Sequence, residues 1–257
     1  MLLKLLRPLI AAVFTLPLIM PAAVFRFLPH SQARFARLTM LWARVCCRIV
    51  GIRVVRSGEY EGAPSGMIVS NHVSWIDILV IGSLRPCVFV SKHEVRYWPV
   101  LGQLAMLVNT IFIERESRRA SFGTLEKVTK AAASGASVVV FPEGKPSDGT
   151  GVLPFKCMLF EVPARTGVPI IPVSIAYDSP EAPWFGGMLF APHIWSFLGV
   201  RRTTASVRFG AVISGQSGEG GRAARKSLCA ESERAVREGL VRAKSMLLQK
   251  VDFEGRM

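Results

Sequence analysis

From Met67 onward, short apolar runs rich in β-branched residues alternate with longer helical patterns. Strands are predicted at residues 66–70, 87–91, 109–113, 137–141 and 169–175, with two more at 51–56 and 205–213. Helices are predicted between them at residues 76–84, 99–107, 118–134 and 156–166. Such alternation is typical of an α/β fold, in which helices cover a mixed sheet.

A chain of 257 residues is long enough for one sizeable α/β domain with its own core. We place this domain at residues 51–214. Residues 1–50 are predicted to form a membrane-anchoring helical segment. Residues 215–257 are predicted to form a Gly-rich linker followed by a basic helix at 222–251.

Charge and hydropathy together favour a membrane surface as a partner. Lysine and arginine outnumber aspartate and glutamate by 32 to 18, and the net charge is +14. Half of the residues are hydrophobic, and the mean hydropathy is +0.36. A chain both basic and apolar fits an anionic membrane surface better than nucleic acid. The sequence shows no clustered aromatic and basic residues of an RNA-binding signature, so no nucleic-acid partner is expected.

The N-terminus combines basic residues with an apolar stretch. Lys4 and Arg7 precede an apolar segment at residues 9–25, which resembles a signal peptide but lacks a clear cleavage site before Arg26. The segment is close to the lower length limit for spanning and contains two prolines. A re-entrant anchor is therefore favoured over a single span, and we expect residues 1–50 to dock on the cytoplasmic face of an inner membrane.

Residues 31–49 carry a basic amphipathic pattern at helical spacing, with arginines at positions 34, 37, 44 and 48. A helix of this kind can lie at the level of the lipid headgroups. The alternative is a helix of the protein core whose outer face is basic.

The five cysteines are odd in number and show no Cys-x-x-Cys spacing. Neither a disulfide framework nor a zinc site is indicated. We therefore expect reduced thiols, a cytoplasmic domain and no metal.

His72 and Asp77 stand five positions apart, between a predicted strand and a predicted helix. On a regular helix these positions point about 140° apart, so the two side chains can meet only if His72 lies in a turn before the helix. Asp77 could then hold one imidazole nitrogen and leave the other free to accept a proton from a hydroxyl. The alternative is a helix-capping pair without a chemical role.

Further polar residues follow other predicted strands. Residues 109–115 end in Arg115, and residues 140–145 contain Glu143, Gly144 and Lys145. Taken alone, each of these segments is more often a solvated loop than a site. Residues 168–173 form an apolar strand whose prolines suit a sheet edge or a strand start.

Together these segments resemble the glycerolipid acyltransferase family, whose familiar members are 1-acylglycerol-3-phosphate acyltransferases. The family's Asn-His-x-x-x-x-Asp block matches Asn71, His72 and Asp77, and its apolar strand ending in arginine matches residues 111–115. Its Phe-Pro-Glu-Gly block matches residues 141–144, and its Val-Pro-Ile-x-Pro-Val block matches residues 168–173. One such block is weak evidence, whereas four in order are highly specific.

The resemblance implies a role for each matching residue. His72 would be the general base and Asp77 would hold its tautomer. The substrate-binding candidates are Asn71, Arg115, Glu143, Gly144 and Lys145, with Ser74, Trp75 and Lys92 as possible pocket-lining residues. Acyl-CoA or acyl carrier protein would be the acyl donor and a membrane lysolipid the acceptor, with no metal or prosthetic group. The active site would face the cytoplasm.

The sequence departs from the family after Gly144. Members that use phosphate acceptors often continue with Thr-Arg, whereas this chain continues with Lys145 and Pro146. We expect lysophosphatidate as the acceptor because Arg115 is present, with lyso-ornithine lipid as the alternative because its acyltransferases also tend to lack that arginine. A hydrolase is disfavoured because no Gly-x-Ser-x-Gly elbow is present. An inactive lipid-binding protein is disfavoured by the intact His72 and Asp77.

Overall fold

A computed structural model describes residues 5–7, 31–59, 65–98, 101–113, 118–133, 135–216 and 221–254. The strands are β1 (Ile52–Gly58), β2 (Met67–Ser70), β3 (Cys87–Lys92), β4 (Ile111–Ile113), β5 (Ser137–Val140), β6 (Ile170–Tyr177) and β7 (Thr203–Phe209). The α-helices are α2 (Ser31–Val50), α3 (Ile76–Leu84), α4 (Leu101–Leu107), α5 (Arg118–Ala133), α6 (Glu161–Thr166), α7 (Phe190–Phe197) and α8 (Arg222–Glu254). Two 3₁₀ helices are η1 (His93–Tyr97) and η2 (Cys157–Phe160).

The seven strands form one sheet in the order β1-β7-β6-β2-β5-β3-β4. Neighbouring strands are parallel except β6 and β7, which are antiparallel. The predicted mixed α/β sheet with helical cover is therefore confirmed. The central strands β2 and β5 are buried along their whole length, as expected for a sheet covered on both faces.

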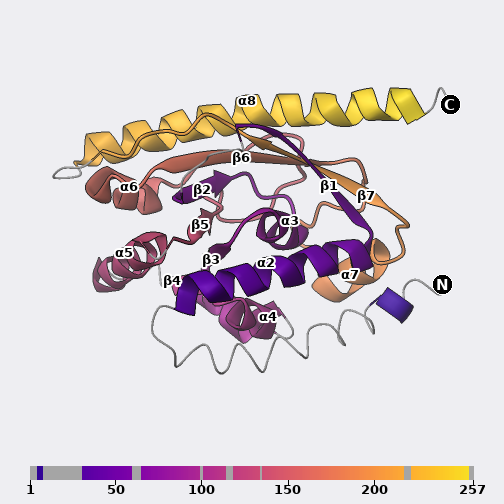
Figure 1. Cartoon of the computed structure of the whole chain (residues 1–257), viewed down its shortest axis with the longest axis horizontal. Helices are drawn as coiled ribbons and strands as arrows, with labels where there is room; N and C mark the ends of the chain where they lie inside the picture. The colour runs from indigo at the N-terminus through magenta and orange to yellow at the C-terminus, as the bar shows by residue number, and fades with distance from the viewer. Residues whose placement is uncertain are drawn as a thin grey trace.

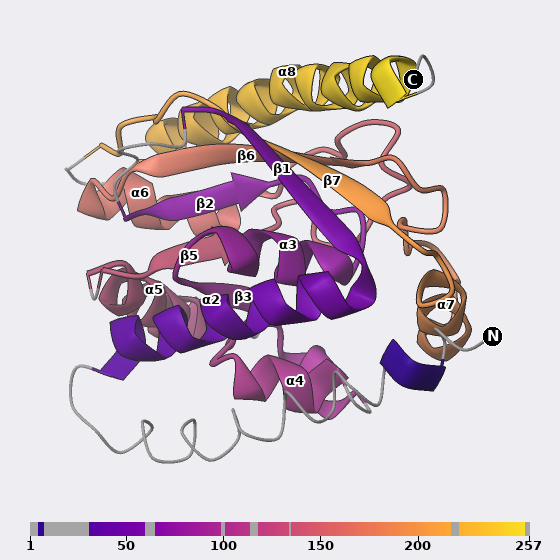
Figure 2. The same ribbon diagram turned by 45° about the vertical axis from the view of Figure 1, so that its right-hand side comes forward.

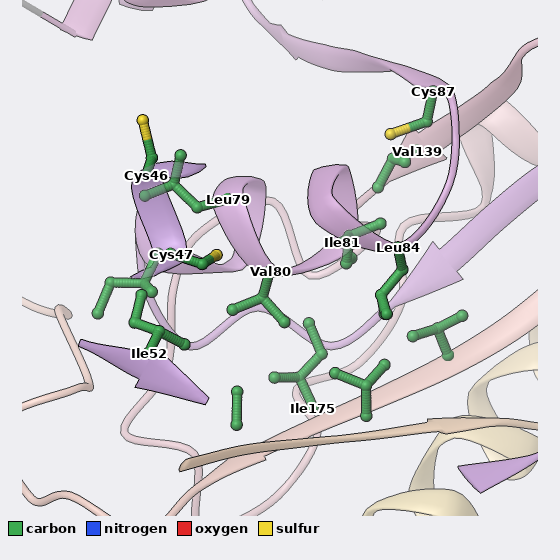
Figure 3. Packing of buried hydrophobic residues seen from close by; sticks show 14 of the residues in the cluster. Cys46, Cys47, Ile52, Leu79, Val80, Ile81, Leu84, Cys87, Val139 and Ile175 are labelled. Atoms are coloured by element: carbon green, nitrogen blue, oxygen red, sulfur yellow. The ribbon is translucent and has the colours of Figure 1, made fainter. Parts of the chain in front are cut away.

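Alternate residues of the central strands enter two separate cores, one on each face of the sheet. Ile68 and Val139 join α2 and α3 in the first core, part of which is drawn in Figure 3. Met67 and Val138 join α5, α6 and α8 in the second. The molecule is thus a three-layer arrangement, with α8 along one side of the sheet and α2 on the other (Figures 1 and 2).

The β6 strand corrects one sequence expectation. Its prolines suited a sheet edge or a strand start, and Pro169 does directly precede the strand, but β6 lies inside the sheet between β7 and β2. Pro172 is tolerated there because its ring nitrogen lies on the β7 side, just outside the antiparallel ladder, which begins at Val173. On that side the Pro172 carbonyl accepts a hydrogen bond from Gly210.

The α2 helix follows the alternative that its sequence left open. Its apolar face packs on α3, with Cys46, Cys47 and Val50 buried in the first core. The arginines stay on the exposed face, and the Arg44 side chain donates to the Ser83 carbonyl at 2.7 Å. The expectation that this apolar face lies in a membrane is therefore wrong, because the protein core already occupies it.

The α8 helix packs along β6 and β7 and buries residues such as Val236 and Leu240 in the second core. A disulfide joins its Cys229 to Cys157 of η2. The expectation of reduced thiols is therefore wrong for this pair, whose spacing of 72 residues gave no sequence signal. Cys46, Cys47 and Cys87 are free and buried.

The predicted apolar anchor at residues 9–25 lies outside the described residues. None of the helices in the described part of the chain is both long and apolar enough to cross a membrane. Arg7, in the short described stretch before that segment, donates to the carbonyls of Leu198, Val200 and Arg201 after α7.

Candidate active site

The site lies where three neighbouring parallel strands end on the same edge of the sheet. His72 follows β2, Phe141 follows β5, and Tyr177 ends β6. Since β2 pairs with both β5 and β6 in parallel, the carboxyl ends of all three converge. This is the edge at which open α/β sheets place their ligands.

His72 and Asp77 make the contact that their spacing predicts. His72 lies in the turn before α3, and Asp77 lies in the first turn of that helix. The Nδ1 atom of His72 is 2.7 Å from Oδ2 of Asp77. With Nδ1 carrying the proton toward the carboxylate, Nε2 is the nitrogen that can accept a proton. The imidazole is 17% exposed, whereas the carboxylate is fully buried.

Asp77 accepts three further hydrogen bonds. The backbone N–H groups of Val73 and Ser74 donate to Oδ2 at 2.7 and 2.9 Å, so Asp77 also caps the turn. The hydroxyl of Tyr177 donates to Oδ1 at 2.7 Å. Burial and the adjacent carboxylate raise the pKa of Tyr177, so this hydroxyl keeps its proton. Tyr177 is a site residue that the sequence analysis missed, and its only signal was its position at a strand end.

The loop after β5 fixes the backbone of His72 from both sides. Glu143 Oε1 accepts from the His72 N–H at 3.0 Å, and both the N–H and the hydroxyl of Ser147 donate to the His72 carbonyl. The Phe141 ring stacks on the imidazole, with centroids 4.2 Å apart. Burial raises the pKa of Glu143 to about 7.

Asn71 lies behind the histidine and is fully buried. Its side-chain amide donates to the Ile175 carbonyl at 3.0 Å, while its side-chain oxygen accepts from the Ile175 N–H at 2.8 Å. Asn71 therefore fastens the end of β2 to β6. Like Asn71, Glu143 lies beneath the turn, whereas Gly144 and Lys145 lie on the wall of a cavity in front of it.

This cavity has a volume of about 1470 Å³ and opens beside His72. Most of its lining is apolar, with side chains from α2, α3, β3, α4 and α7 such as Trp42, Leu79, Phe89, Leu104 and Ile194. Its charged lining residues include Lys92, Glu94, Lys145 and Asp148. Trp75 and Lys92 line it as expected, whereas Ser74 is buried. Gly144 has φ of 76°, a conformation that favours glycine and keeps the loop close to the cavity.

Arg115, the expected anion ligand, lies outside the described residues. Among the residues that are described, no group of three or more His, Cys, Asp or Glu side chains could hold a metal ion. The arrangement therefore offers a carboxylate-held imidazole at the mouth of a large apolar cavity. Such a site can remove a proton from a hydroxyl carried by a lipid-like substrate.

Comparisons with known proteins agree with this chemistry. The sequence profile of the acyltransferase family matches residues 51–176. A lyso-ornithine lipid O-acyltransferase from Rhizobium meliloti is 35% identical over 190 residues, covering 67% of this chain and 65% of the relative. The chain thus spans just under two thirds of that relative. Another from Brucella abortus is 33% identical over 220 residues, covering 78% of this chain and 82% of the relative.

Relatives named for a different acceptor show a similar sequence identity to this chain. A 1-acyl-sn-glycerol-3-phosphate acyltransferase from Neisseria gonorrhoeae is 33% identical over 193 residues, covering 73% of this chain and 74% of the relative. The crystal structure of the 1-acyl-sn-glycerophosphate acyltransferase from Thermotoga maritima matches 95% of both chains, with a TM-score of 0.66 and 23% identity. This structural likeness shows the shared fold.

Proposed function

The chain belongs to the acyltransferase family, as its four motifs indicated, and we propose that it moves a fatty acyl group from an acyl thioester to the free hydroxyl of a lysolipid. The observation that carries this proposal is the His72–Asp77 pair, at 2.7 Å, beside a largely apolar cavity of about 1470 Å³. The donor is acyl-CoA or acyl carrier protein, and the reaction needs no metal or prosthetic group.

In this reaction Nε2 of His72 takes the proton from the acceptor hydroxyl, and the oxygen of that hydroxyl attacks the carbonyl carbon of the thioester. The tetrahedral intermediate then collapses, the carbon–sulfur bond breaks, and the thiolate takes up the proton from the imidazolium. Asp77 stabilises the imidazolium and keeps Nδ1 protonated. Because the hydroxyl attacks directly, no serine or cysteine nucleophile is needed.

Lysophosphatidate is the first acceptor that we propose. Lys92 and Lys145 lie on the cavity wall, and positive charge there suits an anionic headgroup. Arg115 would add a guanidinium, which binds phosphate in bidentate fashion.

Lyso-ornithine lipid is the second acceptor, and a specific observation favours it. The same wall carries the acids Glu94 and Asp148 beside the two lysines. A headgroup with both an ammonium and a carboxylate would find partners of both signs there. Two of the relatives compared above are named for this activity.

A panel assay tests the reaction and the acceptor together. Purified full-length protein is supplied with acyl-CoA or acyl carrier protein as donor and with lysophosphatidate, lyso-ornithine lipid or lysophosphatidylcholine as acceptor. We expect transfer to one of the first two, and a loss of roughly 10²–10⁴-fold in His72→Ala. His93→Ala, a histidine outside the cavity lining, is the matched control. Turnover in His72→Ala equal to that of the control would refute the assignment of the base.

We also propose that the protein works at the cytoplasmic face of an inner membrane, on an anionic surface. Supporting this are the net charge of +14 and the apolar segment at residues 9–25. The test is a deletion of residues 1–30, which spares α2 because that helix completes the core. We expect membrane sedimentation and turnover of bilayer substrate to fall together. Full sedimentation of the truncated protein would place the anchor elsewhere.

A further inference from the structure

A stretch around α7 exposes apolar side chains to an unusual degree. Residues 182–200 contain no aspartate, glutamate, lysine or arginine. Within them, Phe185 is 36% exposed, Met188 46%, Leu189 73% and Trp195 48%. The inward-facing side of this stretch is already packed, because Phe197 is almost fully buried in the core. The exposed side chains therefore do not serve the packing of the domain.

The end of η1 extends this apolar area. Tyr97 is 72% exposed and Trp98, the next residue, 43%. The Trp98 ring lies edge-on to Trp184, with centroids 6.2 Å apart, so the two segments adjoin. We call the exposed set the mouth surface, and its members are Tyr97, Trp98, Phe185, Met188, Leu189 and Trp195.

The mouth surface borders the cavity that contains the catalytic histidine. Trp98, Phe185 and Met188 belong both to this surface and to the cavity lining. Adjoining exposed apolar residues of this kind mark interaction sites on soluble domains. Tryptophan and tyrosine, with an apolar body and a polar tip, are the residues enriched where protein meets the lipid headgroup layer.

Charge around the mouth surface selects an anionic partner. Arg96 is exposed beside Tyr97, and Arg201 and Arg202 are exposed directly after the uncharged stretch. Glu94 and Glu181 are the exposed acids nearest in sequence, and Glu181 already accepts from Ser179. An apolar surface with arginines at its border fits a bilayer that contains anionic lipid.

The N-terminal segment reaches the same place. The Arg7 guanidinium donates to the carbonyls of Leu198 and Arg201 at 3.0 and 2.8 Å, and also to Val200. Arg7 is buried there, so the chain that leads into the apolar segment at residues 9–25 is fastened at the end of α7. The described residues that precede the proposed anchor therefore lie at the end of α7, next to the uncharged stretch.

We propose that the mouth surface inserts into the headgroup layer of an anionic bilayer, so that the cavity opens directly onto lipid. The role of this contact rests on the proposed function: a lysolipid acceptor could move from the bilayer into the cavity without crossing water. The contact itself can be tested without any turnover.

The first experiment attaches an environment-sensitive NBD fluorophore to Leu189→Cys in the full chain. The native free cysteines are buried, and burial raises the pKa of Cys46, Cys47 and Cys87 to about 12, so the new thiol reacts selectively. Val241→Cys on α8, where the native side chain is 66% exposed, carries the control label. Vesicles of phosphatidylethanolamine and phosphatidylglycerol should shift the emission of the Leu189 label to shorter wavelength and leave the control unchanged.

An unchanged Leu189 label on protein that sediments with the vesicles would overturn the proposal. A response to acyl carrier protein but not to vesicles would also overturn it, in favour of a protein partner. The second experiment compares Leu189→Glu with Val241→Glu. If the Leu189 side chain enters the bilayer, its loss in Leu189→Glu should lower turnover of bilayer-embedded lysolipid roughly 10- to 100-fold and leave turnover of a short-chain monomeric lysolipid unchanged. Equal rates in the two variants on bilayer substrate would count against the contact. Wild-type protein inactive on both substrates would instead refute the proposed function, and the label would still decide the contact.

Discussion

Replacing Glu143 with glutamine should change how stability depends on pH. The Glu143 side chain is 3% exposed, and its Oε1 accepts from the His72 N–H at 3.0 Å. Its Oε2 is buried and has no hydrogen-bond partner among the described residues. Burial raises the pKa of this carboxyl from 4.5 to about 7, because the charged form loses its hydration. Glutamine keeps the shape and an accepting oxygen but cannot titrate.

The sign follows from the raised pKa. The folded protein binds the Glu143 proton more tightly than the unfolded chain does, so this group adds stability that is fully present below about pH 4.5. That contribution is lost as the pH rises through about 7. A pKa difference of about 2.5, at about 1.4 kcal/mol for each pH unit, amounts to about 3.5 kcal/mol.

The assay is urea unfolding of the wild-type protein and Glu143→Gln at pH values between 5 and 8. The free energy of unfolding of the wild type, relative to that of the variant, should fall by about 2–3 kcal/mol over this range. Groups such as His72 and Asp77 are present in both proteins, so their contributions largely cancel in the difference. Parallel pH profiles for the two proteins would refute the reasoning that Glu143 is protonated in the folded state at acidic pH.

Two further substitutions test contacts at the site. Tyr177→Phe removes one of the four hydrogen bonds to Asp77, and we expect roughly tenfold lower kcat, about 1.4 kcal/mol, with KM unchanged. Steady-state kinetics decide this, and an unaltered kcat would show that the other three bonds suffice. Arg115→Ala should raise KM for lysophosphatidate, since a charge-assisted contact contributes roughly 1.5–3 kcal/mol. Robust acylation of lyso-ornithine lipid with none of lysophosphatidate would instead select the second acceptor.

Local spacing carried the predictions that the structure confirms. The α3 helix begins and ends where its apolar pattern predicted, because a short buried helix flanked by turns leaves a clear signal. The contact between His72 and Asp77 was predictable for a similar reason. The two residues are five apart, so the geometry of a single turn decides whether they meet.

Contacts between segments that are distant in the sequence could not be predicted from spacing. Tyr177 meets Asp77 across 100 residues, and that meeting depends on the order of strands in the sheet. The α7 helix was missed because it is only eight residues long, contains Pro192 and follows Gly186 and Gly187, which together are typical of a loop. For α2 the pattern was clear, but one amphipathic pattern fits a membrane and a protein core equally well.

The loop after β5 links the choice of acceptor to the position of the base. Its departure from the family pattern, Lys145 and Pro146, lies on the cavity wall where a headgroup would bind. The next residue, Ser147, donates twice to the His72 carbonyl. Any change in this loop that moves Ser147 therefore also moves the histidine. A substitution can change acceptor preference without loss of turnover only if it leaves these two hydrogen bonds in place. The positions suited to such a change are therefore those whose side chains face the cavity.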